Sequence, residues 1–127
     1  MATSGRGGRR PLILFHNDFF GHRPWESPSF GDIDCDITSD RALAPEADAV
    51  VLHVPGLKRW RLNIAKHPRN LWVLWSMESV VNYPVMADRR ALRHFDLRMT
   101  YEQDADIFVP YLPGRQAIAA VCADPLP

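Results

Sequence analysis

A chain of 127 residues is about the length of one domain and is long enough to bury a hydrophobic core. Lys and Arg together number 15, as do Asp and Glu, and this balance excludes the strong positive field typical of nucleic-acid-binding proteins. Two distant cysteines exclude a disulfide framework, and the longest apolar run, 117–123, is too short to span a membrane, so we expect a soluble chain.

The N-terminal third predicts a leader followed by two strands. Residues 1–10 are rich in Gly and Arg and predict a disordered leader. Residues 11–15 form a short apolar run that predicts a buried strand. Residues 19–31 carry Gly, Pro and aromatic residues without periodicity, which indicates a loop. Residues 32–37 alternate polar and apolar side chains, as a half-buried edge strand does.

Helical and strand patterns alternate through the rest of the chain. Ser39 or Asp40 is placed to cap a helical turn. The predicted elements are a helical turn at 41–47, a strand at 49–54, a helix at 57–66, a strand at 71–75, a helix at 85–95, and strands at 97–101 and 107–109. This alternation predicts an α/β fold with a Rossmann-like, mostly parallel sheet and helices on both faces.

The polar residues that follow the predicted strands are the first candidates for a site, because ligands of such sheets bind beyond the carboxyl ends of the strands. These residues are 16–18, His53 and 76–78. Glu78 follows Trp75 by three residues, and an aromatic rim would partly desolvate its carboxylate, as a general base near neutral pH requires. By spacing alone, a solvated acid in an ordinary loop is the more common explanation. His53 is expected to have its hydrogen bonds satisfied.

The sequence predicts no metal site. Asp32, Asp34 and Asp36 form overlapping D-x-D triplets, which hold a divalent cation in some glycosyltransferases. A calcium loop is excluded because Ile37 and Leu43 occupy the positions of the required Gly and Glu. Strict alternation explains the three carboxylates as the solvated side of a strand. The five histidines show no metal-binding spacing, and there is no glycine-rich phosphate-binding motif.

Four segments taken together resemble a known family. They are LWVLWSMES at 71–79, NYP at 82–84, FDLRMTY at 95–101 and DADIFVPY at 104–111. In order and spacing they resemble the N-terminal domain of α-1,3-fucosyltransferases, glycosyltransferase family 10. Residues 35–41 and 47–53 are similar to a weaker segment of the same family.

This resemblance implies the N-terminal half of a GT-B glycosyltransferase, in which two Rossmann-like domains face each other across a cleft. Residues 11–112 would form the acceptor-binding domain, and 113–127 would be a tail where the donor domain is expected to follow. The donor, GDP-fucose, would be bound by that C-terminal domain, so the chain alone is expected to be inactive. No cofactor or metal is implied. Localisation would be cytoplasmic for a bacterial protein and the Golgi lumen for a fragment of a eukaryotic enzyme.

The same resemblance assigns roles to residues. Glu78 matches the family's general base, which would take a proton from a glycan hydroxyl as that oxygen attacks fucose with inversion. The residues expected to contact the acceptor glycan are Ser79, Asn82, Tyr83 and Tyr101.

Two short segments depart from the family pattern. Val80 replaces the usual proline, and Glu102 with Gln103 replaces a common pair of arginines that would add positive charge toward the donor phosphates. A non-catalytic carbohydrate-binding or remnant domain is therefore an alternative, and a generic Rossmann-like protein-interaction module is another.

Overall fold

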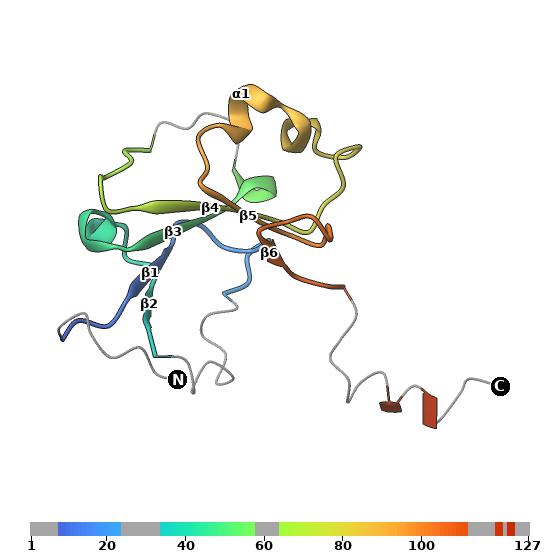
Figure 1. Cartoon of the computed structure of the whole chain (residues 1–127), viewed down its shortest axis with the longest axis horizontal. Helices are drawn as coiled ribbons and strands as arrows, with labels where there is room; N and C mark the ends of the chain where they lie inside the picture. The colour runs from blue at the N-terminus through green and yellow to red at the C-terminus, as the bar shows by residue number, and fades with distance from the viewer. Residues whose placement is uncertain (1–7, 24–33, 58–63, 112–118, 121, 124–127) are drawn as a thin grey trace.

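Six parallel strands form one sheet in the order β2-β1-β3-β4-β5-β6 (Figure 1). The computed structural model describes residues 8–23, 34–57, 64–111, 119–120 and 122–123. The strands are β1 (Leu12–Phe15), β2 (Asp36–Thr38), β3 (Ala49–His53), β4 (Leu71–Ser76), β5 (Leu97–Thr100) and β6 (Ile107–Phe108). The parallel sheet and the Rossmann-like α/β class predicted from the sequence are thereby confirmed.

The register of the sheet brings the carboxyl ends of all strands to one edge. β3 pairs with β4 from Ala49 opposite Leu71 to His53 opposite Trp75. The positions of the predicted strands agree with the structure to within one or two residues, except for β2. β2 lies at the edge of the sheet, as expected, but it covers 36–38 rather than 32–37, of which 32 and 33 lie outside the described residues.

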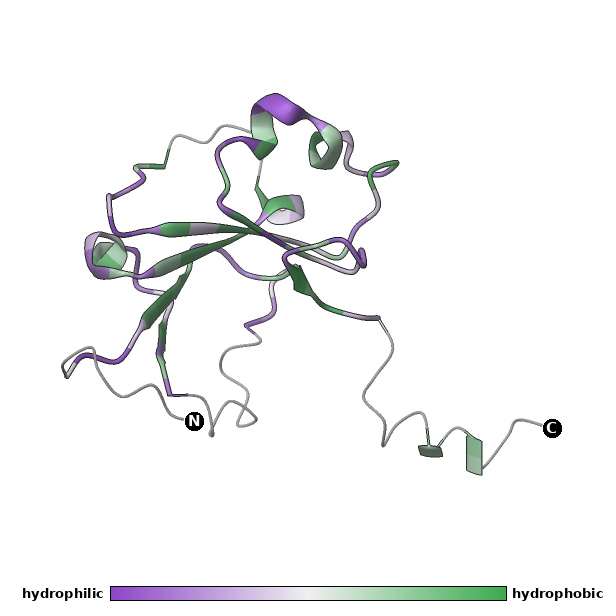
Figure 2. Ribbon diagram, viewed as in Figure 1, coloured by the Kyte–Doolittle hydropathy of each residue, from purple (hydrophilic) through white to green (hydrophobic). Residues whose placement is uncertain are grey.

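The main core lies on one face of the sheet, which we call the first face. Because side chains alternate along a strand, paired residues of neighbouring strands share a face. The buried residues of the first face are Leu14 of β1, Val50 and Leu52 of β3, and Trp72 and Leu74 of β4. Three helical turns cover them, and Figure 2 shows apolar strands under the polar outer side of α1.

The opposite face, the second face, carries Phe15, Val51, His53 and Trp75. Among the described residues, the loop after β1 contacts this face through aromatic rings. Helices were expected on both faces. Within the described residues, helical turns cover the first face, and the loop after β1 contacts the second face.

The helical segments are shorter than predicted. The covering turns are η3 (Arg41–Glu46), η5 (Pro84–Ala87) and α1 (Arg89–Leu92), with a further turn, η4 (Val54–Gly56), after β3. Asp40 caps η3 by accepting a hydrogen bond from the Ala42 N–H, as predicted.

The single helix predicted at 85–95 is wrong in extent. The backbone is extended at Asp88, whose side chain accepts a hydrogen bond from the Arg90 N–H and so starts α1 separately from η5. Ala91 is buried and Phe95 packs against the core, so the predicted inward face is confirmed. Of the helix predicted at 57–66, residues 58–63 lie outside the described residues and 64–66 are not helical.

The described ends of the chain add two observations. Arg9, in the stretch predicted as a leader, donates two hydrogen bonds of 2.7 Å to the Asp48 carboxylate, so the described fold includes it. Within 113–127, residues 119–120 and 122–123 are described and are helical. No helix formed by the described part of the chain is long and apolar enough to cross a membrane.

Candidate active site

Two neighbouring strands end in the same way at the carboxyl edge of the sheet. Ser76 and Thr100, the last residues of β4 and β5, lie opposite each other and are almost fully buried. The Ser76 hydroxyl accepts a hydrogen bond of 3.1 Å from the Glu78 N–H, and the Thr100 hydroxyl accepts one of 3.2 Å from the Glu102 N–H. These local bonds end the hydrogen-bonded pairing of β4 with β5. They also fix the backbone of both acidic residues at the carboxyl edge of the sheet, which we call the rim.

Glu78 is half-buried, and its carboxylate forms no ion pair with the described residues. Two tyrosines lie at the same edge. The rings of Tyr101 and Tyr111 have centroids 5.1 Å apart. The pKa of the Tyr111 hydroxyl is raised, first by partial desolvation and then by the negative charge of Glu78 and by Tyr101. The structure therefore pairs the two tyrosine rings and places Tyr111 within electrostatic range of Glu78.

The other residues predicted to bind an acceptor lie in the turn after Glu78. The Ser79 hydroxyl accepts a hydrogen bond from the Asn82 N–H, and the Ser79 carbonyl accepts one from the Tyr83 N–H. Asn82 is exposed at this turn. Tyr83 is half-buried and packs against the core near Met86, so part of its ring faces the interior. The turn thus keeps Ser79 and Asn82 at the rim and draws Tyr83 toward the core.

Tyr111 was missed by the sequence reasoning as a site residue. It lies beyond β6 and is 63% exposed, and a backbone hydrogen bond from the Val109 N–H to the Thr100 carbonyl holds this stretch beside β5. Its position at the end of the DIFVPY segment was the available signal.

A second cluster at the same edge surrounds His53. The imidazole is fully buried, and its ring lies 4.5 Å from Phe19, 4.8 Å from Phe20 and 5.3 Å from Trp75, measured between centroids. The backbone of His53 is satisfied, because the Asn17 amide accepts from its N–H at 2.9 Å and donates to its carbonyl at 2.8 Å.

The ring nitrogens of His53 are different. Neither makes a hydrogen bond of good geometry within the described residues, so the hydrogen bonding expected for His53 is found at its backbone and not at its ring. Burial lowers the pKa of His53 from 6.5 to about 4, and the nearby Asp18 carbonyl opposes this change in part. The ring is therefore neutral near pH 7.

The hairpin over His53 is a tight turn. Phe19 and His22 exchange two backbone hydrogen bonds of 2.9 and 2.8 Å. Phe20 and Gly21 between them both have positive φ, 47° and 80°, as a type I′ turn requires. The ring of Phe19 stacks on Trp75 with centroids 4.8 Å apart, so the hairpin reaches the end of β4 just before Glu78.

The two described carboxylates of the acidic triplets, Asp34 and Asp36, lie beside an arginine. Arg10 lies 3.6 Å from the Asp34 carboxylate and 3.4 Å from that of Asp36, which gives both a cationic partner. Asp32 lies outside the described residues. Within the described part of the chain, no group of three or more His, Cys, Asp or Glu side chains could hold a metal ion.

Comparison with known proteins identifies the family of this chain. The family described as "Fucosyltransferase, N-terminal" matches residues 8–112. Human alpha-(1,3)-fucosyltransferase 7 is 37% identical over an alignment that is 129 positions long. This alignment covers 86% of this chain and 37% of the relative. Bovine 3-galactosyl-N-acetylglucosaminide 4-alpha-L-fucosyltransferase FUT3 is 38% identical over 85 residues, which cover 64% of this chain and 23% of the relative.

The chain therefore spans between about a quarter and two fifths of the length of these relatives. The matched region contains all six strands and the rim that carries Glu78. This chain belongs to the fucosyltransferase family, glycosyltransferase family 10, and carries its N-terminal domain.

Proposed function

We propose that this chain is the acceptor-binding half of an inverting fucosyltransferase and that Glu78 is its general base. The observation that carries the proposal is the position of Glu78 at the carboxyl edge of a parallel sheet, where such folds bind ligands. Its carboxylate is half-buried and has no cationic partner among the described residues, so it is available to accept a proton.

In the proposed reaction, an acceptor glycan hydroxyl gives its proton to Glu78 while its oxygen attacks the anomeric carbon of fucose. A new C–O bond forms on one face of the sugar, and the bond to GDP breaks on the other. GDP leaves with the electron pair, and the configuration at the anomeric carbon inverts. Glu78 later releases the proton to solvent.

Aromatic side chains beside Glu78 suit a sugar acceptor. Tyr101 and the exposed Tyr111 offer ring faces and hydroxyl groups at the same edge of the sheet, and Tyr111 is within electrostatic range of Glu78. Ser79 and Asn82, in the turn after Glu78, add polar groups at the same rim. We therefore assign Tyr101, Tyr111, Ser79 and Asn82 to acceptor contact.

We assign the donor, GDP-fucose, to a C-terminal domain of the complete transferase. The relatives are about three to four times as long as the region they share with this chain, which supports this division. The 127-residue chain by itself is then expected to bind acceptor without transferring fucose.

The test compares Glu78→Gln with Glu102→Gln in a complete transferase that contains this domain. Both acids follow a strand end by two residues and both have the same backbone hydrogen bond, so Glu102 is a matched control. Glu78→Gln should lower kcat by about 10²–10⁴-fold and retain acceptor binding, because only the proton acceptor is removed. Full turnover in Glu78→Gln, or an equal loss in both variants, would contradict the proposal.

A second candidate function is carbohydrate binding without catalysis. It is favoured by Glu102, which stands where the family has arginine and pairs with Arg98 at 3.5 Å, so negative charge replaces positive charge near the rim. In this case the glycan would bind with the same affinity with or without GDP-fucose, and Glu78→Gln would change no measured rate. Saturation-transfer NMR with a glycan acceptor, recorded on the complete transferase with and without GDP, separates the two candidates, because only the catalytic candidate expects the nucleotide to change acceptor binding.

A further inference from the structure

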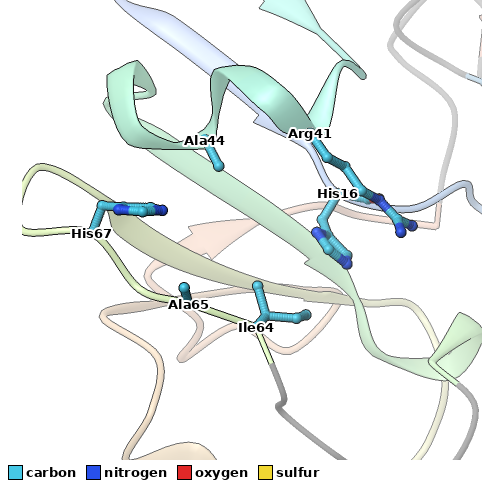
Figure 3. A pocket seen from close by; sticks show the side chains of 6 residues that line it. All are labelled: His16, Arg41, Ala44, Ile64, Ala65 and His67. Carbon is cyan, nitrogen blue, oxygen red and sulfur yellow. The ribbon is translucent and has the colours of Figure 1, made fainter.

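A cavity of about 240 Å³ lies between η3 and the segment that leads into β4, apart from the rim that carries Glu78. Its lining residues are His16, Arg41, Ala44, Ile64, Ala65 and His67. Figure 3 shows His16 and Arg41 together at one end and His67 at the other, with the three apolar residues between them. The cavity surface is mostly apolar, with polar side chains at its two ends, and its volume has room for several waters or for a small ligand.

The lining carries three nitrogen-bearing side chains and no carboxylate. The Arg41 Nε donates a hydrogen bond of 2.9 Å to the His16 carbonyl, which holds the guanidinium at the mouth of the cavity. Its terminal nitrogens form no ion pair with the described acidic residues. Arginine presents paired N–H donors that match the oxygens of a phosphate, sulfate or carboxylate group.

Both histidine rings are also available. The backbone of His16 is fully used, since its N–H donates to the Val51 carbonyl and its own carbonyl accepts from Arg41. The backbone of His67 is paired with Asn70. Neither imidazole has a hydrogen-bond partner among the described residues, so each can donate to a ligand.

Two acidic residues on the flanking segments have partners outside the cavity. Asp40, next to Arg41, accepts the capping hydrogen bond from the Ala42 N–H. Asp96 pairs with Lys66 at 2.6 Å. The residues that line the cavity include no carboxylate to pair with Arg41, and the pKa of His16 is lowered by burial and by the charge of Arg41.

We propose that this cavity is a binding site for a phosphate or sulfate group, held by Arg41 and by N–H groups of His16 and His67. This proposal does not depend on the role of Glu78, because neither Glu78 nor any residue assigned to acceptor contact lines the cavity. The group could be a free anion or part of a larger ligand, since both present the same oxygens to the site.

The experiment titrates the 127-residue chain with sodium phosphate and follows the imidazole resonances of His16 and His67 by NMR, against sodium chloride of equal ionic strength. We expect a saturable shift of both rings with phosphate. Bound anion should also raise the pKa of His16, because it favours the protonated ring. Shifts that sodium chloride reproduces in full would overturn the proposal.

Variants locate the site. Arg41→Gln should weaken phosphate binding about tenfold or more, because it removes a charge-assisted contact. Arg89→Gln, on the exposed side of α1, changes the net charge equally and should leave binding unchanged. Arg41→Gln also removes the hydrogen bond from Arg41 to the His16 carbonyl, which can disturb folding. His67→Gln lies on a different segment and leaves that bond in place, so it tests the site separately. Unchanged affinity in both Arg41→Gln and His67→Gln would overturn the proposal.

Two further probes distinguish the source of the group. Galactose 6-sulfate is compared with inorganic sulfate, and GDP with inorganic phosphate. Tighter binding of a larger probe, abolished by Arg41→Gln, supports a site for that class of ligand, and equal binding supports a free-anion site. Galactose without sulfate should give no saturable shift at His16.

Discussion

Acidification is expected to destabilise this domain through His53. The ring is fully buried among Phe19, Phe20 and Trp75, and its pKa falls from 6.5 in the unfolded chain to about 4 in the folded one. A lowered pKa means that the unfolded state binds the proton more strongly below pH 6.5. The stability contributed by the neutral ring is therefore complete above pH 6.5 and is lost as the pH falls toward 4.

The size of the effect follows from these two pKa values. Linkage gives a loss of about 2 kcal/mol between pH 8 and pH 5, and about 3 kcal/mol by pH 4. This is a large share of the roughly 5–15 kcal/mol by which domains are stable. His16, whose pKa is also lowered, acts in the same direction, so the wild-type slope includes both residues.

The assay is urea unfolding at pH 8, 7, 6 and 5, followed by tryptophan fluorescence. His53→Leu removes the titrating group, and we expect it to flatten the pH dependence by about 2 kcal/mol over this range. His94→Leu, an exposed position after α1, is the control and should keep the wild-type slope. An undiminished acid loss in His53→Leu would refute the reasoning.

Three further stability predictions follow from contacts near this edge. Leu74→Ala, at a fully buried position, should cost about 2–5 kcal/mol in urea unfolding, and a smaller loss would mean that the core refills the cavity. Asn17→Ala should cost about 1–3 kcal/mol because it removes both bonds to the His53 backbone, whereas Asn82→Ala at an exposed site should stay within about 0.5 kcal/mol. Gly56→Ala would place a methyl group 2.9 Å from the Asn17 amide nitrogen and 3.2 Å from the His53 Nδ1, so we expect a loss of about 1–3 kcal/mol, and wild-type stability would show that the loop relaxes freely.

The sequence by itself determined the class of fold and the position of Glu78 at the edge of the sheet. Continuous apolar runs at 49–54 and 71–75 identified the central strands, because strands covered on both faces cannot alternate with polar residues. The polar residues just beyond such a strand must lie at the edge where ligands bind, and this placed Glu78 at the rim. Local chemistry sufficed for these features.

The tertiary structure alone decided which side chains meet. Tyr111 meets Tyr101 because β6 pairs with β5, a pairing that the hydrophobic pattern does not encode. The helix predicted at 85–95 is divided because Asp88 hydrogen-bonds to the backbone in an extended conformation that competes with the helix. The buried state of His53 depends on a hairpin more than 30 positions earlier in the chain, so its lowered pKa could not be read from its neighbours in sequence. Burial and pairing between distant segments set these properties, and they exist only in the folded chain.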